Sequence, residues 1–335
     1  MAFARLRTTE RTGSPWHSGE SAGGSCGPSG RFRAKMDDSA RATAFRSVTR
    51  LNVASIQDVR ELARRQLPKV LFDLIDGGAG NEVTLRANQD DFDRLKLVWR
   101  VLTDVSKRDL GTRVLGQDLD LPLILAPTGA PGAFWPNGGI EAARAAEREG
   151  AGFCLSTAST SSIEDTAAAL GRPFWFQLYL TKDREMSRRF IQRAHDAGCS
   201  ALALTVDLPM QGQRDRDIRN GLKYPPRITA HSLFDFASRP GWVWRYLTGP
   251  KFSLANFAGE GMAEKYGSLA EFVNTQFDPS ASWKDIAWVR ECWPRKLLLK
   301  GILHPEDARM ACDHGVDGII VSNHGGRQLD GVPSS

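Results

Sequence analysis

The chain has 335 residues, of which 41% are hydrophobic and 25% charged, a composition typical of a globular protein with a core, at a length that suits one large α/β domain. Much of its net charge of +5 comes from the first fifty residues, and no basic stripe with interleaved aromatic residues follows, so we expect no nucleic-acid partner. The five cysteines are scattered and never spaced C-x-x-C, which argues against a disulfide framework or a metal site and favours a reducing, cytoplasmic compartment.

Residues 1–45 are rich in Gly, Ser and Arg and have no hydrophobic period. They bury too little apolar area to offset the entropy lost on ordering, so they are predicted to be a disordered N-terminal extension. Their Arg-rich, acid-poor character resembles an organelle transit peptide. The alternative, which we prefer, is an over-extended start, because Met36 lies just ahead of the ordered pattern.

Residues 46–335 have the pattern of one α/β domain. Two helices are expected first, "SIQDVRELARRQL" with Ser55 as its N-cap and "LPKVLFDLIDGG" between Pro68 and Gly77. Short apolar runs then alternate with amphipathic helical stretches, which indicates βα units and a parallel sheet buried on both faces. The apolar runs cover 123–126, 152–156, 174–178, 201–206, 297–299 and 318–321.

Each of these apolar runs ends on polar residues. Polar groups at the carboxyl ends of successive parallel strands are typical of the active site of a (β/α)8 TIM barrel, whereas a doubly wound sheet binds its ligand at one switch point. We therefore predict a barrel of which about the first six βα units are present; either the family has six strands or the chain lacks its end. The polar residues are Thr128, Ser156, Thr157, Gln177, Tyr179, Thr205, Asp207, Lys300, Ser322 and His324.

The connection over about 208–295 is far longer than usual and is predicted to be a loop insertion. It contains "FDFASRPGWVWRYLTGPKFSLANF", in which aromatic rings beside Arg suit a membrane interface. One prediction is therefore a peripheral contact through 231–257 with the inner face of the membrane. The other, which we favour, is a lid that buries these rings in a small core of its own. The longest apolar runs are strand-sized, so no transmembrane helix is expected.

The loop after the last apolar run carries the strongest chemical signal. His324 lies in a Gly-Gly loop three residues before Arg327, and a base beside a fixed cation suits proton abstraction from a substrate whose carboxylate the Arg binds. Asp207 is suited to orient the imidazole. Arg214 is either a second carboxylate ligand or a solvated loop charge. Lys300 either binds an anionic cofactor or intermediate or forms a structural ion pair.

Several long motifs occur here in the order found in one enzyme family. "FQLYLTKDR", "ALTVDLPMQGQRDRDIRN", "FDPSASWKDIAWVR", "LKGILHPEDAR" and "SNHGGRQLD" resemble the FMN-dependent α-hydroxy-acid dehydrogenases and oxidases, which include glycolate oxidase, L-lactate dehydrogenase and mandelate dehydrogenase. The resemblance covers about Ile56 to the end. "GAFWPNGGIEAARAA" and "LSTAS" look closest to the bacterial mandelate and lactate dehydrogenases.

The resemblance implies oxidation of a lactate- or mandelate-like 2-hydroxy acid to the 2-keto acid, with electrons passing through FMN to oxygen, a quinone or a cytochrome. It implies that the complete enzyme is a homo-oligomer. The catalytic residues would be the base His324 and its partner Asp207, and the substrate-binding residues would be Tyr179, Arg214 and Arg327. The implied FMN contacts come from Thr128, Gly129, Thr157, Gln177, Thr205 and Lys300.

The sequence departs from the family pattern in two ways. Leu74 stands where the family usually has a Tyr that binds the substrate carboxylate, a loss of about 1.5–3 kcal/mol. Ala158 stands where glycolate oxidases tend to have a Trp, so we expect a bulkier or less polar substrate. The family also continues through two more βα units whose glycine-rich loops hold the FMN phosphate. Nothing of this kind occurs here, so a fragment or truncated reading frame is expected.

Three hypotheses follow. The first is an FMN-dependent hydroxy-acid dehydrogenase recorded without its C-terminal quarter. The second is a truncated, non-catalytic product that does not hold the FMN phosphate. The third, the weakest, is a phosphate-binding barrel of another class, such as an aldolase with Lys300 as a Schiff-base amine, because a His and Arg pair suited to a hydroxy acid would then go unused.

Overall fold

The computed structural model describes residues 2–5, 53–221, 230–258 and 275–335. The chain divides into two compact units, Arg7–Arg65 and a larger one made of Met1–Leu6 and Gln66–Ser335. In the smaller unit the described residues include α2 (Ile56–Gln66). The Ser55 hydroxyl accepts a hydrogen bond from the Asp58 N–H (3.3 Å), and the Asp58 carboxylate accepts one from the Ser55 N–H (2.8 Å). This reciprocal cap satisfies N–H groups that have no partner within the helix and confirms Ser55 as the N-cap.

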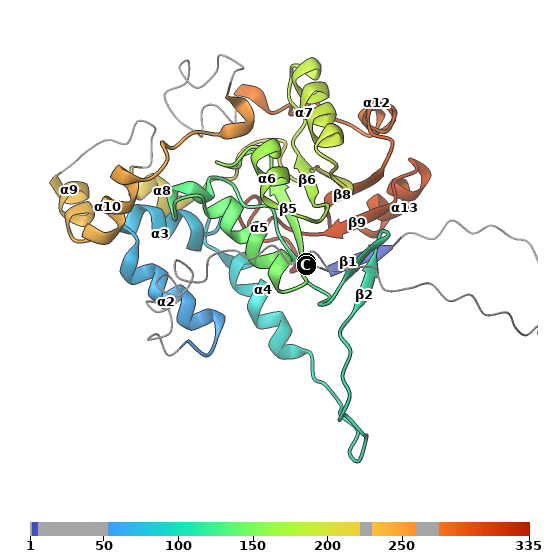
Figure 1. Ribbon diagram of the computed structural model, residues 1–335, viewed down its shortest axis with the longest axis horizontal. Coiled ribbons are helices and arrows are strands. Elements are labelled where there is room, and N and C mark those ends of the chain that lie inside the picture. The colour runs from blue at the N-terminus through green and yellow to red at the C-terminus, as the bar shows by residue number, and fades with distance from the viewer. Residues whose placement is uncertain (1, 6–52, 222–229, 259–274) are drawn as a thin grey trace, which may run out of the picture. The chain divides into compact units, whose positions relative to one another are not determined.

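The larger unit is built on a sheet with the strand order β1-β9-β8-β7-β6-β5-β4 (Figure 1). Strands β4 to β9 all run parallel, and they match the six apolar runs. Their bounds are β4 (Ile124–Leu125), β5 (Gly152–Ser156), β6 (Trp175–Leu178), β7 (Ala201–Thr205), β8 (Lys296–Ile302) and β9 (Gly318–Val321). The edge strand β1 (Ala2–Arg5) pairs antiparallel with β9. Apart from these four residues, the predicted disordered extension lies outside the described residues.

The two faces of the sheet are covered differently. On one face, strand residues such as Phe176 and Leu202 pack with helix residues such as Phe190 and Val289 in the main core cluster. The opposite face has a smaller cluster drawn from the strands alone. A parallel sheet with helices on one face and its own side chains on the other is the arrangement of a barrel wall. The covering helices are α5 (Gly138–Arg148), α6 (Ile163–Ala169), α7 (Arg184–Asp196), α12 (Lys284–Cys292) and α13 (Pro305–Asp313).

A short hairpin closes the amino end of the inner face. Strands β2 (Thr112–Val114) and β3 (Gln117–Leu119) pair antiparallel, and Val114 packs against the inner cluster. The Gln117 amide accepts a hydrogen bond from the Trp175 indole (3.1 Å) and donates one to the carbonyl of Pro173 (2.9 Å). The open end of the sheet is therefore the carboxyl end.

Two helices precede the sheet and are joined to its carboxyl-end loops. Helix α3 (Lys69–Asp76) begins after Pro68 and ends at Gly77, as predicted, and α4 (Val83–Arg94) follows. In the turn between them the Ala79 N–H donates to the Gly326 carbonyl (2.8 Å) and the Gly80 N–H donates to the Gln213 carbonyl (3.0 Å). The end of α3, the segment after β7 and the loop after β9 are therefore held together.

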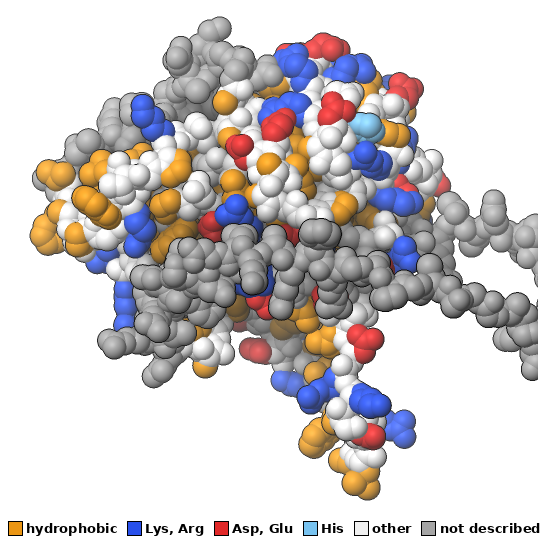
Figure 2. Space-filling model, in the orientation of Figure 1, with side chains coloured by type: hydrophobic (Ala, Val, Ile, Leu, Met, Phe, Trp, Pro, Cys, Tyr) orange, Lys and Arg blue, Asp and Glu red, His pale blue; other side chains and the backbone are white. Residues whose placement is uncertain are grey.

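The insertion contains α8 (Asp215–Arg219), α9 (Ala230–Ala237), α10 (Pro240–Thr248) and η2 (Ala255–Phe257), and its residues 222–229 and 259–274 lie outside the described residues. Trp242 is buried; its ring stacks on Tyr246 (centroids 4.9 Å apart) and its indole donates to the Ala133 carbonyl (3.0 Å). Phe234 and Trp244, by contrast, are 75% and 70% exposed. Figure 2 shows apolar side chains gathered over α9 and α10. One side of this segment thus forms a small core, as the lid hypothesis predicts, and another side is apolar and uncovered.

In the described part of the chain, every helix is too short or too polar to cross a bilayer.

Candidate active site

A layer of polar side chains lies on the face of the sheet opposite the helices. It lies next to the smaller apolar cluster of that face, nearer the carboxyl ends of the strands. Side chains two positions apart on a strand share a face, so the layer is formed two residues after the members of that cluster. The cluster residues are Cys154, Trp175, Ala203, Leu298 and Ile320. The corresponding polar residues, all buried, are Ser156, Gln177, Thr205, Lys300 and Ser322.

Hydrogen bonds fix the polar layer as a floor at the carboxyl end of the strands. The Ser156 hydroxyl donates to the Gln177 carbonyl oxygen (3.1 Å), and the Gln177 amide donates to the Thr205 hydroxyl (2.9 Å). The Lys300 ammonium donates to the Ser322 hydroxyl (3.2 Å). A buried ammonium is costly unless it is paired, and Lys300 has the Asp207 carboxylate 3.7 Å away.

His324 lies above this floor, held by contacts on both ring nitrogens. Its Nδ1 is 2.7 Å from Asp207 Oδ1, and its Nε2 is 3.3 Å from the Tyr179 hydroxyl. Because a carboxylate only accepts hydrogen bonds, Nδ1 carries the proton, and the lone pair of Nε2 points toward Tyr179. The backbone of His324 has a φ of 59°, and its N–H donates to Ser322 (3.0 Å). The structure thus joins three predicted site residues in one constellation.

The second oxygen of Asp207 is buried and has no hydrogen-bond partner among the described residues. It faces the Lys300 ammonium at 3.7 Å. Burial, and then the charge of Asp207, raise the pKa of the Tyr179 hydroxyl, which therefore stays protonated and able to donate. The Tyr179 ring is stacked on Phe277, with centroids 4.4 Å apart, so the hydroxyl has a fixed position.

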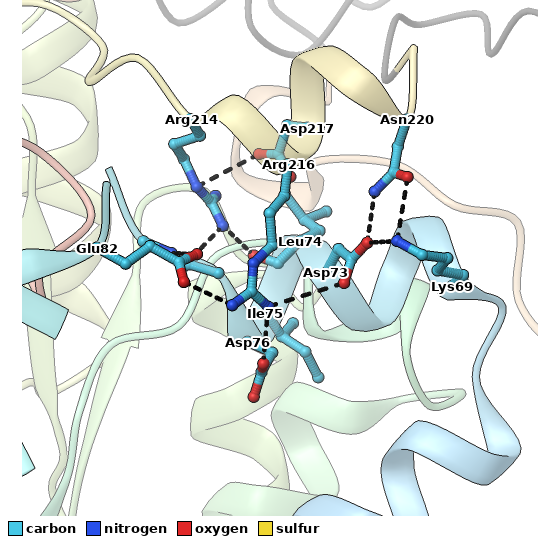
Figure 3. Close-up of polar contacts among 12 residues, drawn as sticks. Lys69, Asp73, Leu74, Ile75, Asp76, Glu82, Arg214, Arg216, Asp217 and Asn220 are labelled. Atoms are coloured by element: carbon cyan, nitrogen blue, oxygen red, sulfur yellow. Dashed lines mark hydrogen bonds and ion pairs between the residues drawn. The ribbon is translucent and has the colours of Figure 1, made fainter. Parts of the chain in front are cut away.

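Arg214 binds the carboxyl-terminal end of α3 (Figure 3), and Arg327 binds it too. Arg214 donates to the carbonyls of Leu74 and Gly77 (the latter at 3.2 Å), and Arg327 donates to the carbonyl of Ile75. The partial negative charge of a helix carboxyl end favours such cations. Burial lowers the pKa of both guanidiniums, and for Arg327 the charge of Arg214 adds to the effect. The two cations are thus mostly buried and close to each other.

An ion network fixes α8 to α3 beside these arginines (Figure 3). Arg216 binds Asp76 at 3.0 Å and Glu82 at 2.5 Å. Asn220 donates to Asp73 at 2.7 Å. Arg214 is the residue just before α8. The network therefore fixes the position of the Arg214 backbone. Sequence reasoning did not assign these contacts.

The remaining predicted cofactor residues differ in their exposure. Thr128 and Gly129, after β4, are exposed. Thr157 is fully buried, and its hydroxyl donates to the backbone carbonyl of Gln177 (2.6 Å), so the predicted Thr157 does not belong to the polar layer. The preceding residue, Ser156, belongs to the polar layer. Its position two residues after Cys154, on the same face of β5, identifies it.

The polar layer fits a flavin ring. A flavin ring offers both hydrogen-bond donors and acceptors along its pyrimidine edge and gains negative charge there on reduction. The layer supplies the Gln177 amide, the Ser156 and Thr205 hydroxyls and the Lys300 ammonium, all buried and fixed. A fixed cation at a site of developing negative charge is the arrangement that stabilises it.

Parallel strands with a histidine, its carboxylate partner and two arginines at their carboxyl ends form the kind of polar site that barrel enzymes have at this end of the sheet. The FMN-dependent dehydrogenase family matches residues 63–335. The L-lactate dehydrogenase of Caulobacter sp. (strain K31) is 46% identical over 287 residues, which are 84% of this chain and 75% of that protein. That of Yersinia pestis (strain Pestoides F) is 44% identical over 285 residues, 84% and 74% of the two chains. The chain therefore belongs to the FMN-dependent dehydrogenase family.

Solved structures agree with this assignment. The monotopic membrane protein (S)-mandelate dehydrogenase is similar with a TM-score of 0.80 and 39% identity, over 84% of this chain and 75% of that one. A mandelate oxidase with (S)-4-hydroxymandelic acid gives a TM-score of 0.71 and 36% identity, over 84% and 73%. The predicted family, barrel fold, FMN cofactor and FMN-dependent oxidation of a 2-hydroxy acid are confirmed. The alternatives of a non-catalytic fragment and of an aldolase are not favoured.

Proposed function

We propose that the chain oxidises a lactate- or mandelate-like 2-hydroxy acid with His324 as the base. This oxidation removes two protons and two electrons from the substrate, and FMN, when bound, accepts the electrons. The observation that carries the proposal is the contact of His324 with Asp207 at 2.7 Å, which leaves Nε2 as the proton acceptor. The imidazolium that forms is stabilised by the adjacent carboxylate.

The substrate carboxylate is bound by Arg214 and Arg327. A guanidinium has five N–H donors and binds a carboxylate in bidentate fashion. Each arginine uses some donors on the end of α3, which leaves others for the substrate. The Tyr179 hydroxyl is 3.3 Å from His324 Nε2, the proton acceptor. It therefore lies beside the substrate and donates a hydrogen bond to a substrate oxygen.

The flavin ring is held by Ser156, Gln177, Thr205 and Lys300, and Ser156 replaces the Thr157 expected from the sequence. Lys300 would stabilise the negative charge that the flavin gains on reduction, since it is a buried cation with Asp207 as its only carboxylate partner among the described residues. Thr128 and Gly129, which follow β4, would contact the flavin through their backbone.

Substitution of His324 tests the role of the base. We expect His324→Gln to lower kcat by about 10²- to 10⁴-fold, the contribution of a positioned general base. His195→Gln, at a side chain whose ion pair is with its exposed neighbour Asp196, is the matched control and should leave kcat unchanged. Equal rates for His324→Gln and the parent chain would refute the proposal.

The substrate has a bulkier or less polar side chain than glycolate has. Leu74 has an apolar, half-buried side chain, and its backbone carbonyl accepts a hydrogen bond from Arg214. The relatives are named for L-lactate and mandelate, and kcat/KM for these acids should exceed that for glycolate. Kinetics that prefer glycolate would contradict this assignment.

We also propose that α9 and α10 bind a membrane surface peripherally, at the inner membrane face. Phe234 and Trp244 are exposed and Arg245 lies 4.6 Å over the Trp135 ring, a combination that suits the interface between headgroups and acyl chains. A similar solved structure is titled a monotopic membrane protein. Of the three electron acceptors considered, a membrane contact favours a quinone.

Vesicle co-sedimentation tests the membrane contact. The double variant Phe234→Glu/Trp244→Glu should lose most binding to vesicles of mixed neutral and anionic phospholipid. Trp99→Glu, at a tryptophan that is 83% exposed outside this segment, should bind as the parent chain does. Unchanged binding by the double variant would exclude this surface.

A further inference from the structure

The Asp217 carboxylate lies beside the Arg214 guanidinium, on the side away from the α3 carbonyls (Figure 3). Its Oδ2 is 3.3 Å from Arg214 Nε, and both side chains are only 14% exposed. Its Oδ1 is buried and lacks a hydrogen-bond partner among the described residues. A buried carboxylate oxygen without a hydrogen bond destabilises the folded state. Packing alone therefore does not explain a carboxylate at this position.

The positively charged side chains around Asp217 explain its position. Burial lowers the pKa of both Arg214 and Arg327, and the nearby charge of Arg214 lowers the pKa of Arg327 further. The carbonyls at the end of α3 offer partial charges only. Burial raises the pKa of Asp217, while Arg214, Arg216 and Arg327 act in the opposite direction and Asp73 in the same one. The net result is a raised pKa. In its charged form Asp217, with Oδ2 3.3 Å from Arg214 Nε, offsets the repulsion between the two buried cations.

We propose that Asp217 is a positioning residue for substrate binding. It fixes Arg214 by the Nε edge of the guanidinium and offsets the charge of the arginine pair, so that both guanidiniums point their remaining donors at one substrate carboxylate. The inference rests on the proposed function, in which Arg214 and Arg327 bind that carboxylate. It predicts that Asp217 contributes to the affinity for the carboxylate more than to the chemical step.

The test measures binding of oxalate, a small dicarboxylate, to the flavin-loaded chain by isothermal titration calorimetry. Asp217→Asn should raise the Kd for oxalate roughly 10- to 100-fold, as expected when the carboxylate of a buried ion pair is removed. In turnover it should raise KM by a similar factor and change kcat by less than about threefold. Asp215→Asn is the matched control, because Asp215 lies on the same helix and pairs with the exposed Arg219.

A double-mutant cycle separates positioning from a general structural effect. If Asp217 acts through Arg214, Asp217→Asn should add little to the Kd of an Arg214→Gln variant. An equal effect in both backgrounds would overturn the proposal, as would an Asp217→Asn variant with the affinity of the Asp215→Asn control. An Arg214→Gln variant with unchanged oxalate affinity would instead refute the proposed function of the arginine pair.

Asp217→Glu keeps the proposal testable if the Asn variant does not fold, which thermal melts of every variant would reveal. The Glu variant retains the charge and should bind oxalate within about threefold of the parent chain. A folded Glu variant with a loss of 10-fold or more would mean that shape and not charge matters, and would count against the proposal.

Discussion

At the scale of single residues, the site depends on a glycine that brings two charged groups together. Gly301, with a φ of 111°, follows Lys300 in β8, and a Cβ at this position would lie 2.5 Å from the Cβ of Asp207. The pairing of β8 with β9 is irregular between Lys300 and Ile302. Only a residue without a side chain lets Asp207 approach β8 and face both Lys300 and His324.

We predict that Gly301→Ala lowers the free energy of unfolding by about 1–3 kcal/mol and lowers kcat, because the new methyl group displaces Asp207 from His324. Gly198→Ala is the matched control, since Gly198 also has a positive φ (79°) but has open space around the added Cβ. It should lose about 1 kcal/mol and keep its kcat. Urea denaturation and steady-state kinetics give both quantities; full activity in Gly301→Ala would contradict the prediction.

At the scale of elements, the sequence predicted the parallel strands because they are apolar runs, of which β5, β6 and β7 are buried along their whole length. It did not predict β1 or the β2–β3 hairpin, whose strands have three or four residues and no clear alternation. The hairpin turn falls on Leu115 and Gly116, which both have positive φ. Such turns usually have Asn, Asp or Gly at the first of these positions, so Leu115 gave no signal of a turn. Continuous apolar runs in a sequence thus identify buried strands, but they do not identify short, exposed strands.

The site shows the same division. His324, Asp207 and Lys300 were predicted from polar residues at strand ends, and the structure joins them. The anchoring of Arg214 on the Leu74 carbonyl was not predictable, because a backbone carbonyl leaves no residue-type signature in a sequence. Asp217 was missed for a different reason: it lies in a segment crowded with charges, where pattern alone does not separate a buried carboxylate from a solvated one.

Asp317 connects three elements at the amino end of the sheet and yields a prediction on pH. It accepts hydrogen bonds from Lys296 (2.7 Å), from the Leu297 N–H (2.9 Å) and from Arg290 of α12 (3.0 Å). Burial acts to raise the pKa of Asp317, but these hydrogen bonds and charges outweigh it and lower the pKa. Its contribution to stability is therefore present above the unfolded pKa of about 3.9 and is lost as the pH falls through the lower folded value.

Asp317→Asn should consequently be less stable than the parent chain at pH 6, and the difference should shrink as the pH falls below about 4. Urea denaturation at several pH values measures it. The exposed Asp118, which pairs with Arg113 on the hairpin, is the control, and Asp118→Asn should show a much smaller difference at pH 6. A difference for Asp317→Asn that grows toward acid would have the wrong sign.

At the scale of the whole molecule, the segment between α4 and β2 exposes a large apolar surface. Figure 1 shows this segment extending away from the sheet, and apolar side chains lie on it in Figure 2. Each of its apolar residues named here is more than half exposed: Leu95, Leu97, Val98, Trp99, Val101, Leu102, Val105 and Leu110. Contiguous apolar patches of this kind promote association, which bears on the homo-oligomer expected from the family resemblance.

We predict that the chain self-associates in a concentration-dependent manner through this segment. Sedimentation velocity over a range of protein concentrations should show the shift, and Leu97→Ser/Trp99→Ser/Leu102→Ser should reduce it, because three of the most exposed apolar groups are removed. Phe234→Ser/Trp244→Ser, in the segment proposed to bind membranes, is the control and should associate as the parent chain does. If the control variant abolished association and the triple variant did not, α9 and α10 would be the interface, and the apolar surface between α4 and β2 would have no part in it.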